Sequence, residues 1–309
     1  MNKALIIIKS PGIGDLQILL SNIHHISRTI GKPVTVLAQK NTGADIIFKH
    51  DPHVEGVLNL EKKEFFRIIN KIKVRNFNQC YIYSDSIRLY LISKFSGISK
   101  IEKYPFFSKK GKNFYKTAKE FTEKILKLKI DSNSKIYWDR NDVEKTKKNY
   151  DIKNNIKNIV CGISASGPTK RWNVDNYIKL FQKINSQFPC KFFLAGGEND
   201  ENLIQKVMHS LENCVPLSKL NIEQIIPIVA SCQYYIGNDT GFGHLSANLN
   251  SKCLMLFCDS PPSAYGLWNP NIKIIVPSGL SVDSCGHNTR GKDKISFNEV
   301  LEKSLELIS

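Results

Sequence analysis

The sequence predicts an α/β protein made of two Rossmann-like domains. Short runs rich in Ile, Val, Phe and Tyr alternate with longer amphipathic stretches, which is the pattern of βαβ units and a parallel sheet. The alternation stops in a polar, Lys- and Asn-rich segment at residues 130–157 and then starts again. The 309 residues also exceed the usual size of a single hydrophobic core. We therefore expect one domain at residues 1–152 and a second at 153–309.

Five apolar runs of the first domain are predicted as strands, with helices between them. The strands are expected at residues 3–9, 34–38, 54–60, 79–84 and 100–104. The helices are expected at residues 15–30, 42–49, 63–73, 87–95 and 115–128.

The second domain repeats the pattern after a connection that contains a short helix. Its strands are expected at residues 158–164, 190–195, 233–237, 253–257 and 273–276. Helices are expected at residues 174–187, 200–210, 222–231 and 241–249. In residues 296–308, Val300, Leu301, Leu305 and Ile308 fall on one helical face, which predicts a packed terminal helix.

The chain is strongly basic, with 44 Lys and Arg against 28 Asp and Glu and a formal charge of +16. An anionic partner or the Lys- and Asn-rich composition of an AT-rich genome explains this balance equally well. The cations are scattered, so a broad basic face is expected and not a basic arm. Eight cysteines lie far apart without a CxxC pair, and they are expected to be reduced and mostly buried, as in a cytosolic protein. No apolar run approaches the roughly 20 residues that spanning a membrane requires.

The first motif, Lys9-Ser-Pro-Gly-Ile-Gly-Asp15, lies between the first strand and the first helix. Gly12 and Gly14 permit a tight turn close to a ligand, beside Ser10, and Asp15 is placed at the start of the helix. The third glycine of a dinucleotide fingerprint is absent. Alone, the motif is better explained by Asp15 as an N-cap on a glycine turn.

The second motif, Gly162-Ile-Ser-Ala-Ser-Gly-Pro-Thr-Lys-Arg-Trp172, is a strand end followed by small residues and two cations. Hydroxyls such as that of Ser166, backbone N–H groups and the compact charge of Lys170 could wrap a diphosphate. The alternative is a surface loop with solvated cations, which fits Arg171 better than the whole string.

The third motif, Ile236-Gly-Asn-Asp-Thr-Gly-Phe-Gly-His-Leu-Ser-Ala247, is again a strand, a small polar turn and a helix. N–H groups from Thr240 onward would point out of a helix N-terminus that carries roughly half a positive charge, so an anion is expected there. His244, one turn into the helix, could face a ligand or be a structural histidine of the core.

The fourth motif, Leu194-Ala-Gly-Gly-Glu-Asn-Asp-Glu201, is a strand end with an acidic loop. A carboxylate in this place could accept both hydroxyls of a ribose, whereas Asp200 could equally be an N-cap. All four motifs follow predicted strands, and open α/β sheets bind ligands at the carboxyl ends of their strands. Together they predict a ligand cleft with a carboxylate facing a phosphate site.

These motifs resemble those of glycosyltransferase family nine, the ADP-heptose:lipopolysaccharide heptosyltransferases. The family begins with a strand, Gly-Asp and a helix, opens its second domain with Lys-x-Trp, and carries Asn-Asp-Thr-Gly followed by His-Leu. The similarity spans nearly the whole chain and is most specific at Asn238–Leu249. It implies a GT-B fold, in which an acceptor-binding and a nucleotide-sugar-binding Rossmann-like domain face each other across a cleft.

The resemblance implies an inverting, metal-independent enzyme that transfers a heptose from an ADP-sugar to a lipopolysaccharide core. Asp15 would be the general base that takes the proton of the acceptor hydroxyl. Lys170 and the amides of Thr240, Gly241 and Phe242 would hold the leaving diphosphate, so no metal or other cofactor is expected.

Further residues take binding roles by the same resemblance. Asp200 or Glu201 would bind the ribose, and Asp239 and His244 would line the diphosphate and sugar site. Arg88 falls near a position where the family carries a basic residue that binds the acceptor. The implied partners are an ADP-sugar and a phosphorylated core acceptor, without nucleic acid. The implied location is the cytoplasm, with peripheral contact at the inner face of the bacterial inner membrane.

Two segments depart from the family pattern. No proline follows Asp15 by about six residues, and Cys258-Asp-Ser-Pro-Pro262 replaces the usual Gly-x-Thr-x-Pro. The donor sugar and acceptor therefore remain open, and the alternatives are transfer from another nucleotide sugar, a GT-B sugar-nucleotide epimerase, or an inactive basic binding or scaffold protein.

Overall fold

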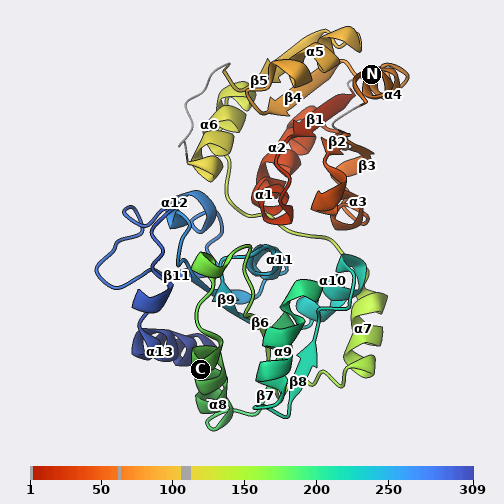
Figure 1. The fold of residues 1–309 in the computed structure, drawn as a ribbon. Coiled ribbons are helices and arrows are strands. Elements are labelled where there is room, and N and C mark those ends of the chain that lie inside the picture. Colours follow the sequence, from red (N-terminus) through yellow and green to blue (C-terminus); the bar gives the residue numbers. More distant parts are fainter. Residues whose placement is uncertain (1–2, 62–63, 106–112) are drawn as a thin grey trace. The chain divides into compact units, whose positions relative to one another are not determined.

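The chain forms two compact units, Met1–Tyr137 and Trp138–Ser309, each built on its own sheet (Figure 1). The structure is a computed structural model and describes residues 3–61, 64–105 and 113–309. The division lies before helix α7 (Arg140–Asn149), whereas we expected it after residue 152. Helix α7 packs against α10 (Ile222–Ala230), so the connecting helix belongs to the second unit.

The first unit contains a five-stranded parallel sheet in the order β3-β2-β1-β4-β5. All five strands lie where the apolar runs predicted them: β1 (Ala4–Ile8), β2 (Val34–Ala38), β3 (Val54–Asn59), β4 (Gln79–Tyr83) and β5 (Lys100–Lys103).

The helices of the first unit also follow the prediction, with one division. The expected helix at residues 15–30 is two helices, because the N–H of Leu19 turns back to the carbonyl of Leu16 at 3.1 Å. The helices are α1 (Ile13–Ile18), α2 (Leu20–Ile30), α3 (Ala44–Ile47), α4 (Phe65–Lys73), α5 (Ile87–Phe95) and α6 (Phe114–Leu126), with a 3₁₀ turn, η1 (Lys40–Thr42).

Helices cover the two faces of this sheet. Cys80 and Ile82 of β4 point into a buried apolar cluster with residues of α4 and α5. Because alternate strand residues face opposite sides, Tyr83 points to the other face. There its hydroxyl lies 2.7 Å from the hydroxyl of Thr122 on α6, which donates to Asn22 of α2 at 2.8 Å.

The second unit contains a six-stranded parallel sheet in the order β11-β10-β9-β6-β7-β8. Five strands match the prediction, and the short edge strand β8 was not expected, since three residues ending in proline give little periodic signal. The strands are β6 (Lys157–Gly162), β7 (Cys190–Ala195), β8 (Cys214–Pro216), β9 (Tyr234–Asn238), β10 (Lys252–Leu256) and β11 (Ile272–Ile275).

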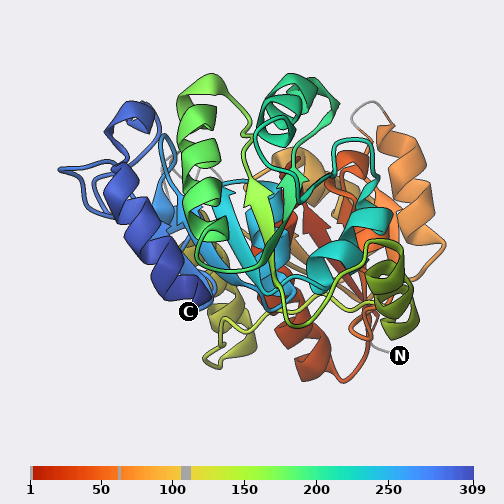
Figure 2. The ribbon, with the colours of Figure 1, turned by 90° about the horizontal axis from the view of Figure 1, so that it is seen from below.

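The predicted helices of the second unit lie close to their expected places, whereas the short helix α12 was not expected. The terminal helix α13 packs beside α8, as Figure 2 shows in dark blue and green. The remaining elements are α8 (Val174–Asn185), α9 (Glu201–Met208), α11 (Gly241–Asn248), α12 (Pro262–Tyr265), α13 (Phe297–Ile308) and the 3₁₀ turns η2 (Pro168–Lys170), η3 (Glu198–Asp200) and η4 (Lys292–Lys294).

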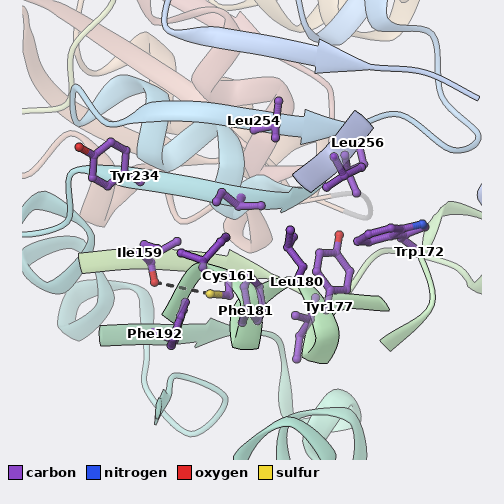
Figure 3. Packing of buried hydrophobic residues seen from close by; sticks show 14 of the residues in the cluster. Ile159, Cys161, Trp172, Tyr177, Leu180, Phe181, Phe192, Tyr234, Leu254 and Leu256 are labelled. Atoms are coloured by element: carbon purple, nitrogen blue, oxygen red, sulfur yellow. Dashed lines mark hydrogen bonds between the residues drawn. The ribbon is translucent and has the colours of Figure 1, made fainter. Parts of the chain in front are cut away.

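A row of aromatic rings in the core of the second unit anchors the loop after β6. The ring centroids of Trp172 and Tyr177 lie 4.9 Å apart in an edge-to-face contact. The rings of Tyr177 and Phe181 stack with centroids 5.7 Å apart, and the centroid of Phe181 lies 5.1 Å from that of Phe192 in β7 (Figure 3). The eight cysteines, all within the described residues, form no disulfide, and all but the half-buried Cys214 are buried as expected.

Both sheets contain a point where the strand order reverses. In the first sheet the order turns between β1 and β4, and in the second between β6 and β9. Loops that leave neighbouring strands in opposite directions open a crevice at such a point, which is where ligands bind in open α/β sheets. The backbone at the second reversal is tightly packed: a Cβ on Gly237 would lie 2.4 Å from Cα of Gly162.

We predict that Gly237→Ala destabilises the second unit, because the added Cβ would meet backbone atoms that have no room to move. The expected loss is about 1–3 kcal/mol, seen as a lower urea-unfolding midpoint. Gly56→Ala is the matched control, because Gly56 also lies in a strand and its Cβ would meet nothing within 4 Å. Equal midpoints for the two variants would contradict this packing argument.

Candidate functional site

The buried side chain of Asn238 joins three segments at the reversal point of the second sheet. Its Oδ1 accepts a hydrogen bond from the backbone N–H of Trp172 at 3.0 Å. Its Nδ2 donates to the carbonyls of Ile163 at 3.3 Å and Ser164 at 3.1 Å. We did not predict this role, although a fully buried asparagine closing an apolar strand is a signal that could have indicated it.

The loop held by Asn238 carries Lys170, which is half-buried at the end of η2. Its positive charge lowers the pKa of Asp239, which follows β9, and the pKa of Asp259, which follows β10. Burial raises the pKa of Asp259, but the hydroxyl of Thr169, the N–H of Arg290 at 2.9 Å and the charge of Lys170 together hold that pKa below its ordinary value. Ser166, on the same loop, is exposed.

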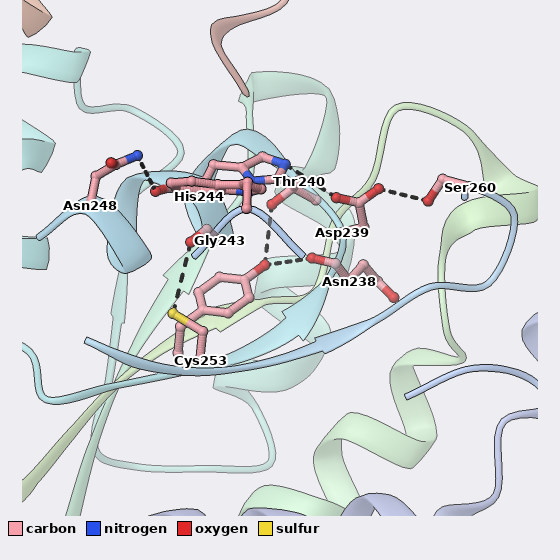
Figure 4. Close-up of polar contacts among 10 residues, drawn as sticks. Asn238, Asp239, Thr240, Gly243, His244, Asn248, Cys253 and Ser260 are labelled. Carbon is pink, nitrogen blue, oxygen red and sulfur yellow. Dashed lines mark hydrogen bonds and ion pairs between the residues drawn. The ribbon is translucent and has the colours of Figure 1, made fainter. Parts of the chain in front are cut away.

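Asp239 lies in a hydrogen-bonded network with His244 and Ser260 (Figure 4). His244 Nε2 lies 3.3 Å from Asp239 Oδ1, and the hydroxyl of Ser260 donates to Oδ2 at 2.6 Å. Burial raises the pKa of Asp239, but these two partners and Lys170 together lower it below its ordinary value. Asp239 is therefore an ionised carboxylate with a donor on each oxygen.

The orientation of His244 is set by Trp268. The indole Nε1 of Trp268 donates to His244 Nδ1 at 3.1 Å, and an indole nitrogen can only donate. The ring therefore carries its proton on Nε2, where it can donate to Asp239. His244 is buried, so the structure favours the role of a positioning histidine, which was one of the two open interpretations.

Helix α11 begins at the same place. Thr240 is its N-cap and its side chain makes no capping hydrogen bond, while the Thr240 carbonyl accepts from Gly243 and His244. The first helical N–H groups, those of Gly241 and Phe242, have no carbonyl one turn earlier within the helix. The expected anion-binding helix terminus therefore lies next to the Lys170 loop, to which Asn238 ties it.

Asp200 and Glu201 already have partners within the chain. Asp200 pairs with Arg171 at 3.1 Å and accepts from the N–H of Gly197 at 3.0 Å, so it caps the 3₁₀ turn η3. Glu201 accepts from the hydroxyl of Ser218 at 2.6 Å and from Gln205 at 2.9 Å. Arg171 is thus paired and half-buried, and the expectation of a solvated cation was wrong.

In the first unit, Asp15 lies in the first turn of α1 at the carboxyl end of β1. Gly12 is the N-cap of this helix, so the alternative in which Asp15 is the N-cap was wrong. A Cβ on Gly12 would lie 3.3 Å from the Asp15 carboxylate, so glycine leaves room beside it. Ser10 and Gly14 belong to the same turn and are half-buried, as is Asp15.

Arg88 lies at the same edge of the first sheet as Asp15. It is in the first turn of α5, directly after β4, which is the neighbour of β1 in the sheet. Its Nη2 donates to the carbonyl of Glu61 at 3.3 Å. The carboxylate of Asp15 and the guanidinium of Arg88 therefore follow the carboxyl ends of two adjacent strands.

The segment after β10, noted above as a departure from the family pattern, supplies residues that the sequence analysis missed. Asp259 contacts the Lys170 loop and Ser260 holds Asp239. Trp268, which follows helix α12, orients His244. Among the described residues, no group of three or more His, Cys, Asp and Glu side chains is arranged to hold a metal ion.

We predict that Asn238→Ala loosens residues 163–172 because it removes the acceptor of the Trp172 amide and the donor to two carbonyls. One unsatisfied buried group costs about 1–3 kcal/mol. Hydrogen exchange of the Trp172 amide should accelerate at least tenfold. Ser166→Ala, which changes an exposed side chain of the same loop, is the control, and unchanged exchange in Asn238→Ala would contradict the role given to Asn238.

The sequence of the chain is similar to those of known proteins. The family model of glycosyltransferase family 9 (heptosyltransferase) matches residues 114–294, more than half of the chain. Lipopolysaccharide heptosyltransferase 1 of Campylobacter coli is 29% identical over 149 residues, which are 46% of this chain and 42% of that protein. Lipooligosaccharide heptosyltransferase 2 of Haemophilus influenzae is 29% identical over 108 residues, 33% of this chain and 31% of that protein. The chain spans less than half the length of these curated relatives.

Solved structures show the same fold over nearly the whole chain. E. coli ADP-heptose lipopolysaccharide heptosyltransferase II has a TM-score of 0.76 at 17% identity, covering 99% of this chain and 98% of its own. A family 9 glycosyltransferase of Veillonella parvula has a TM-score of 0.82 at 13% identity, with 99% and 97% covered. E. coli heptosyltransferase WaaC, solved with ADP, has a TM-score of 0.74 at 15% identity, with 98% and 99% covered. The chain belongs to glycosyltransferase family 9, the heptosyltransferase family, and has its GT-B fold.

Proposed function

We propose that this protein is an inverting, metal-independent glycosyltransferase that moves a heptose from an ADP-sugar to a lipopolysaccharide core acceptor. The observation that carries the proposal is the arrangement after β6 and β9, where Lys170 and the first amides of α11 lie beside the braced carboxylate Asp239. Membership of family 9 and the similar fold of a heptosyltransferase solved with ADP support it.

In this proposal the second unit binds the donor. The diphosphate lies against the N–H groups of Gly241 and Phe242, where the helix dipole favours an anion, and Lys170 adds a full positive charge. Ser166 offers a hydroxyl from the same loop. His244 and Asp239 hold the turn in place and line the sugar end of the site.

The ribose is proposed to lie near the acidic loop after β7. Asp200 is committed to Arg171 and Gly197, and Glu201 accepts bonds from Ser218 and Gln205. A carboxylate oxygen has two lone pairs, so either residue can accept a ribose hydroxyl in addition to its present partners.

Asp15 is proposed to start the reaction. Its carboxylate takes the proton of an acceptor hydroxyl, and the oxygen attacks the anomeric carbon from the side opposite the diphosphate. The bond from that carbon to the diphosphate oxygen breaks, ADP leaves with the bonding electron pair, and the configuration is inverted. Arg88, at the same sheet edge, is placed to pair with a phosphate of the acceptor.

Metal independence is part of the proposal, and it is supported by donors of the protein that could take the place of a metal ion. The charge that develops on the leaving diphosphate needs donors aimed at its oxygens, and donors already in position require no rearrangement during the reaction. Lys170 and the α11 amides supply them. Addition of EDTA should therefore leave turnover unchanged, and restoration of lost activity by Mg²⁺ would overturn this part.

The proposed place of action is the cytoplasmic side of the inner membrane, where the chain would contact the surface peripherally. No helix in the described parts of the chain is long and apolar enough to cross a bilayer. The formal charge of +16 suits both an anionic surface and a phosphorylated acceptor, and binding to nucleic acid is not part of the proposal.

The direct test is incubation of the protein with ADP-heptose and a phosphorylated core acceptor. Formation of ADP and of a glycosidic bond with inverted configuration is the expected result. If the protein uses only another nucleotide sugar, the assignment of the donor must be changed. If it epimerises the nucleotide sugar without an acceptor, the assignment as a transferase is wrong. Affinity for nucleic acid with a steep salt dependence, in the absence of any turnover, would favour a basic binding protein.

We predict that Asp15→Ala lowers the transfer rate about 10²- to 10⁴-fold, because it removes the base that takes the acceptor proton. Affinity for ADP, measured by calorimetry, should remain nearly unchanged. Asp45→Ala is the control, since Asp45 is an exposed carboxylate in the first turn of α3. Full activity of Asp15→Ala would remove the general-base assignment.

We predict that Lys170→Ala weakens donor binding or turnover about 10- to 100-fold, because a charged hydrogen bond to the diphosphate is lost. The KM for the ADP-sugar and the kcat are the measurements. Lys179→Ala, which removes an exposed cation from the nearby helix α8, should change neither. Unchanged kinetics for Lys170→Ala would place the diphosphate elsewhere.

A further inference from the structure

Large exposed apolar side chains of the described residues gather on helices α4 and α5 of the first unit. In the described parts of the chain, seven large apolar side chains are more than one third exposed. Four of them lie on these helices or directly after α4: Phe66 at 79%, Val74 at 81%, Ile87 at 49% and Phe95 at 60%. The two helices pack against each other, and the hydroxyl of Ser96 donates to the carbonyl of Ile69 at 3.3 Å. A concentration of this kind marks an interaction surface.

Helical spacing places these side chains on one outward stripe of each helix. On α4, Phe66 and Val74 are eight residues apart, so they fall on the same side, with Asn70 midway between them. On α5, Ile87 and Phe95 have the same spacing, with the half-buried Leu91 midway. The opposite sides of both helices are buried in the core of the first unit.

The stripe on α4 is bordered by cations. Arg67, Lys71 and Arg75, together with Asn70 and Val74, line a surface pocket of about 600 Å³. No carboxylate is among its lining residues, although Arg67 pairs with Glu64 at 2.6 Å and Lys71 lies 3.9 Å from Glu61.

Two further cations are exposed beside the apolar stripes. Lys73 lies in the last turn of α4 and Lys94 in the last turn of α5. Five cations on this surface therefore outnumber the two carboxylates paired with them, and the balance is positive. We call Phe66, Val74, Phe95 and the five cations the α4–α5 face.

We propose that the α4–α5 face docks on an anionic lipid bilayer, with Phe66, Val74 and Phe95 inserted at the level of the head groups and the cations on lipid phosphates. Apolar side chains flanked by Lys and Arg are the chemistry of a helix that lies in a membrane interface. A protein partner with acidic residues at its rim would also pair with these charges. A pocket lined by three cations, one asparagine and one apolar residue, however, suits a phosphate joined to an acyl chain.

This inference deepens the proposed function and rests on it, since peripheral contact with the membrane surface is part of that proposal. Helix α5 starts at Ile87 and Arg88, at the carboxyl edge of the first sheet where Asp15 also lies. Docking through α4 and α5 would therefore bring that edge close to the lipid surface.

The test is sedimentation of the full chain with vesicles, which requires neither donor nor acceptor. The protein should bind vesicles of phosphatidylglycerol and phosphatidylcholine and bind pure phosphatidylcholine much more weakly. The double variant Phe66→Ser/Val74→Ser should lose at least tenfold in partitioning, because two apolar side chains no longer enter the interface. Arg67→Gln/Lys71→Gln should lose about fivefold per cation on the anionic vesicles.

The matched control is Leu267→Ser, which removes an apolar side chain that is 55% exposed on the second unit and should leave partitioning unchanged. Transfer to a soluble acceptor fragment should be the same in Phe66→Ser/Val74→Ser as in the natural protein, which also reports correct folding. Absence of vesicle binding, or equal binding by the double variant, would overturn the proposal and leave the transferase untouched. A dimer that the double variant converts to monomers would assign the face to a second copy instead.

Discussion

The side-chain amide of Asn238 is the interaction on which the rest of the candidate site depends. It lies where the strand order of the second sheet reverses, and it holds the loop after β6 through Ile163, Ser164 and Trp172. Asn238 directly precedes Asp239 and the start of α11, so one buried side chain fixes both halves of the site. The close approach of Gly162 and Gly237 makes this geometry possible, because any side chain at Gly237 would force the strands apart.

Charge in the site is organised around Lys170. Two carboxylates, Asp239 and Asp259, lie within reach of its charge, and both have a lowered pKa despite burial. Each oxygen of Asp239 accepts a hydrogen bond, one from His244 and the other from Ser260. The carboxylate therefore stabilises the turn at Thr240. Trp268 keeps His244 in the tautomer that donates to Asp239. A diphosphate that binds here would contact one lysine and the first amides of a helix. The nearby carboxylates of Asp239 and Asp259 already accept hydrogen bonds from other groups of the protein.

Local patterns predicted the elements of both units, because side-chain periodicity reports directly on which face of a strand or helix is buried. The exceptions have local causes. Leu19 divides the first helix without any Gly or Pro to indicate it, and β8 is too short to show a period. Helix α7 was expected inside the connection, but its own sequence does not say which core it joins, so the domain boundary was placed after it.

The sequence by itself determined the two parallel sheets, the loops that bear Asp15, Lys170 and Thr240, and the family to which they belong. Only the tertiary structure decided the partners of those residues: Asp239 with Ser260, His244 with Trp268, and Arg171 with Asp200. Strand order brings together loops that are far apart in the chain, such as those of Trp172 and Asn238, which are 66 residues apart. It is a property of the assembled sheet, and the periodicity of a single segment does not contain it. For this reason the sequence showed the segment after β10 only as a departure from the family pattern, whereas the structure shows that Asp259 and Ser260 of this segment belong to the candidate site.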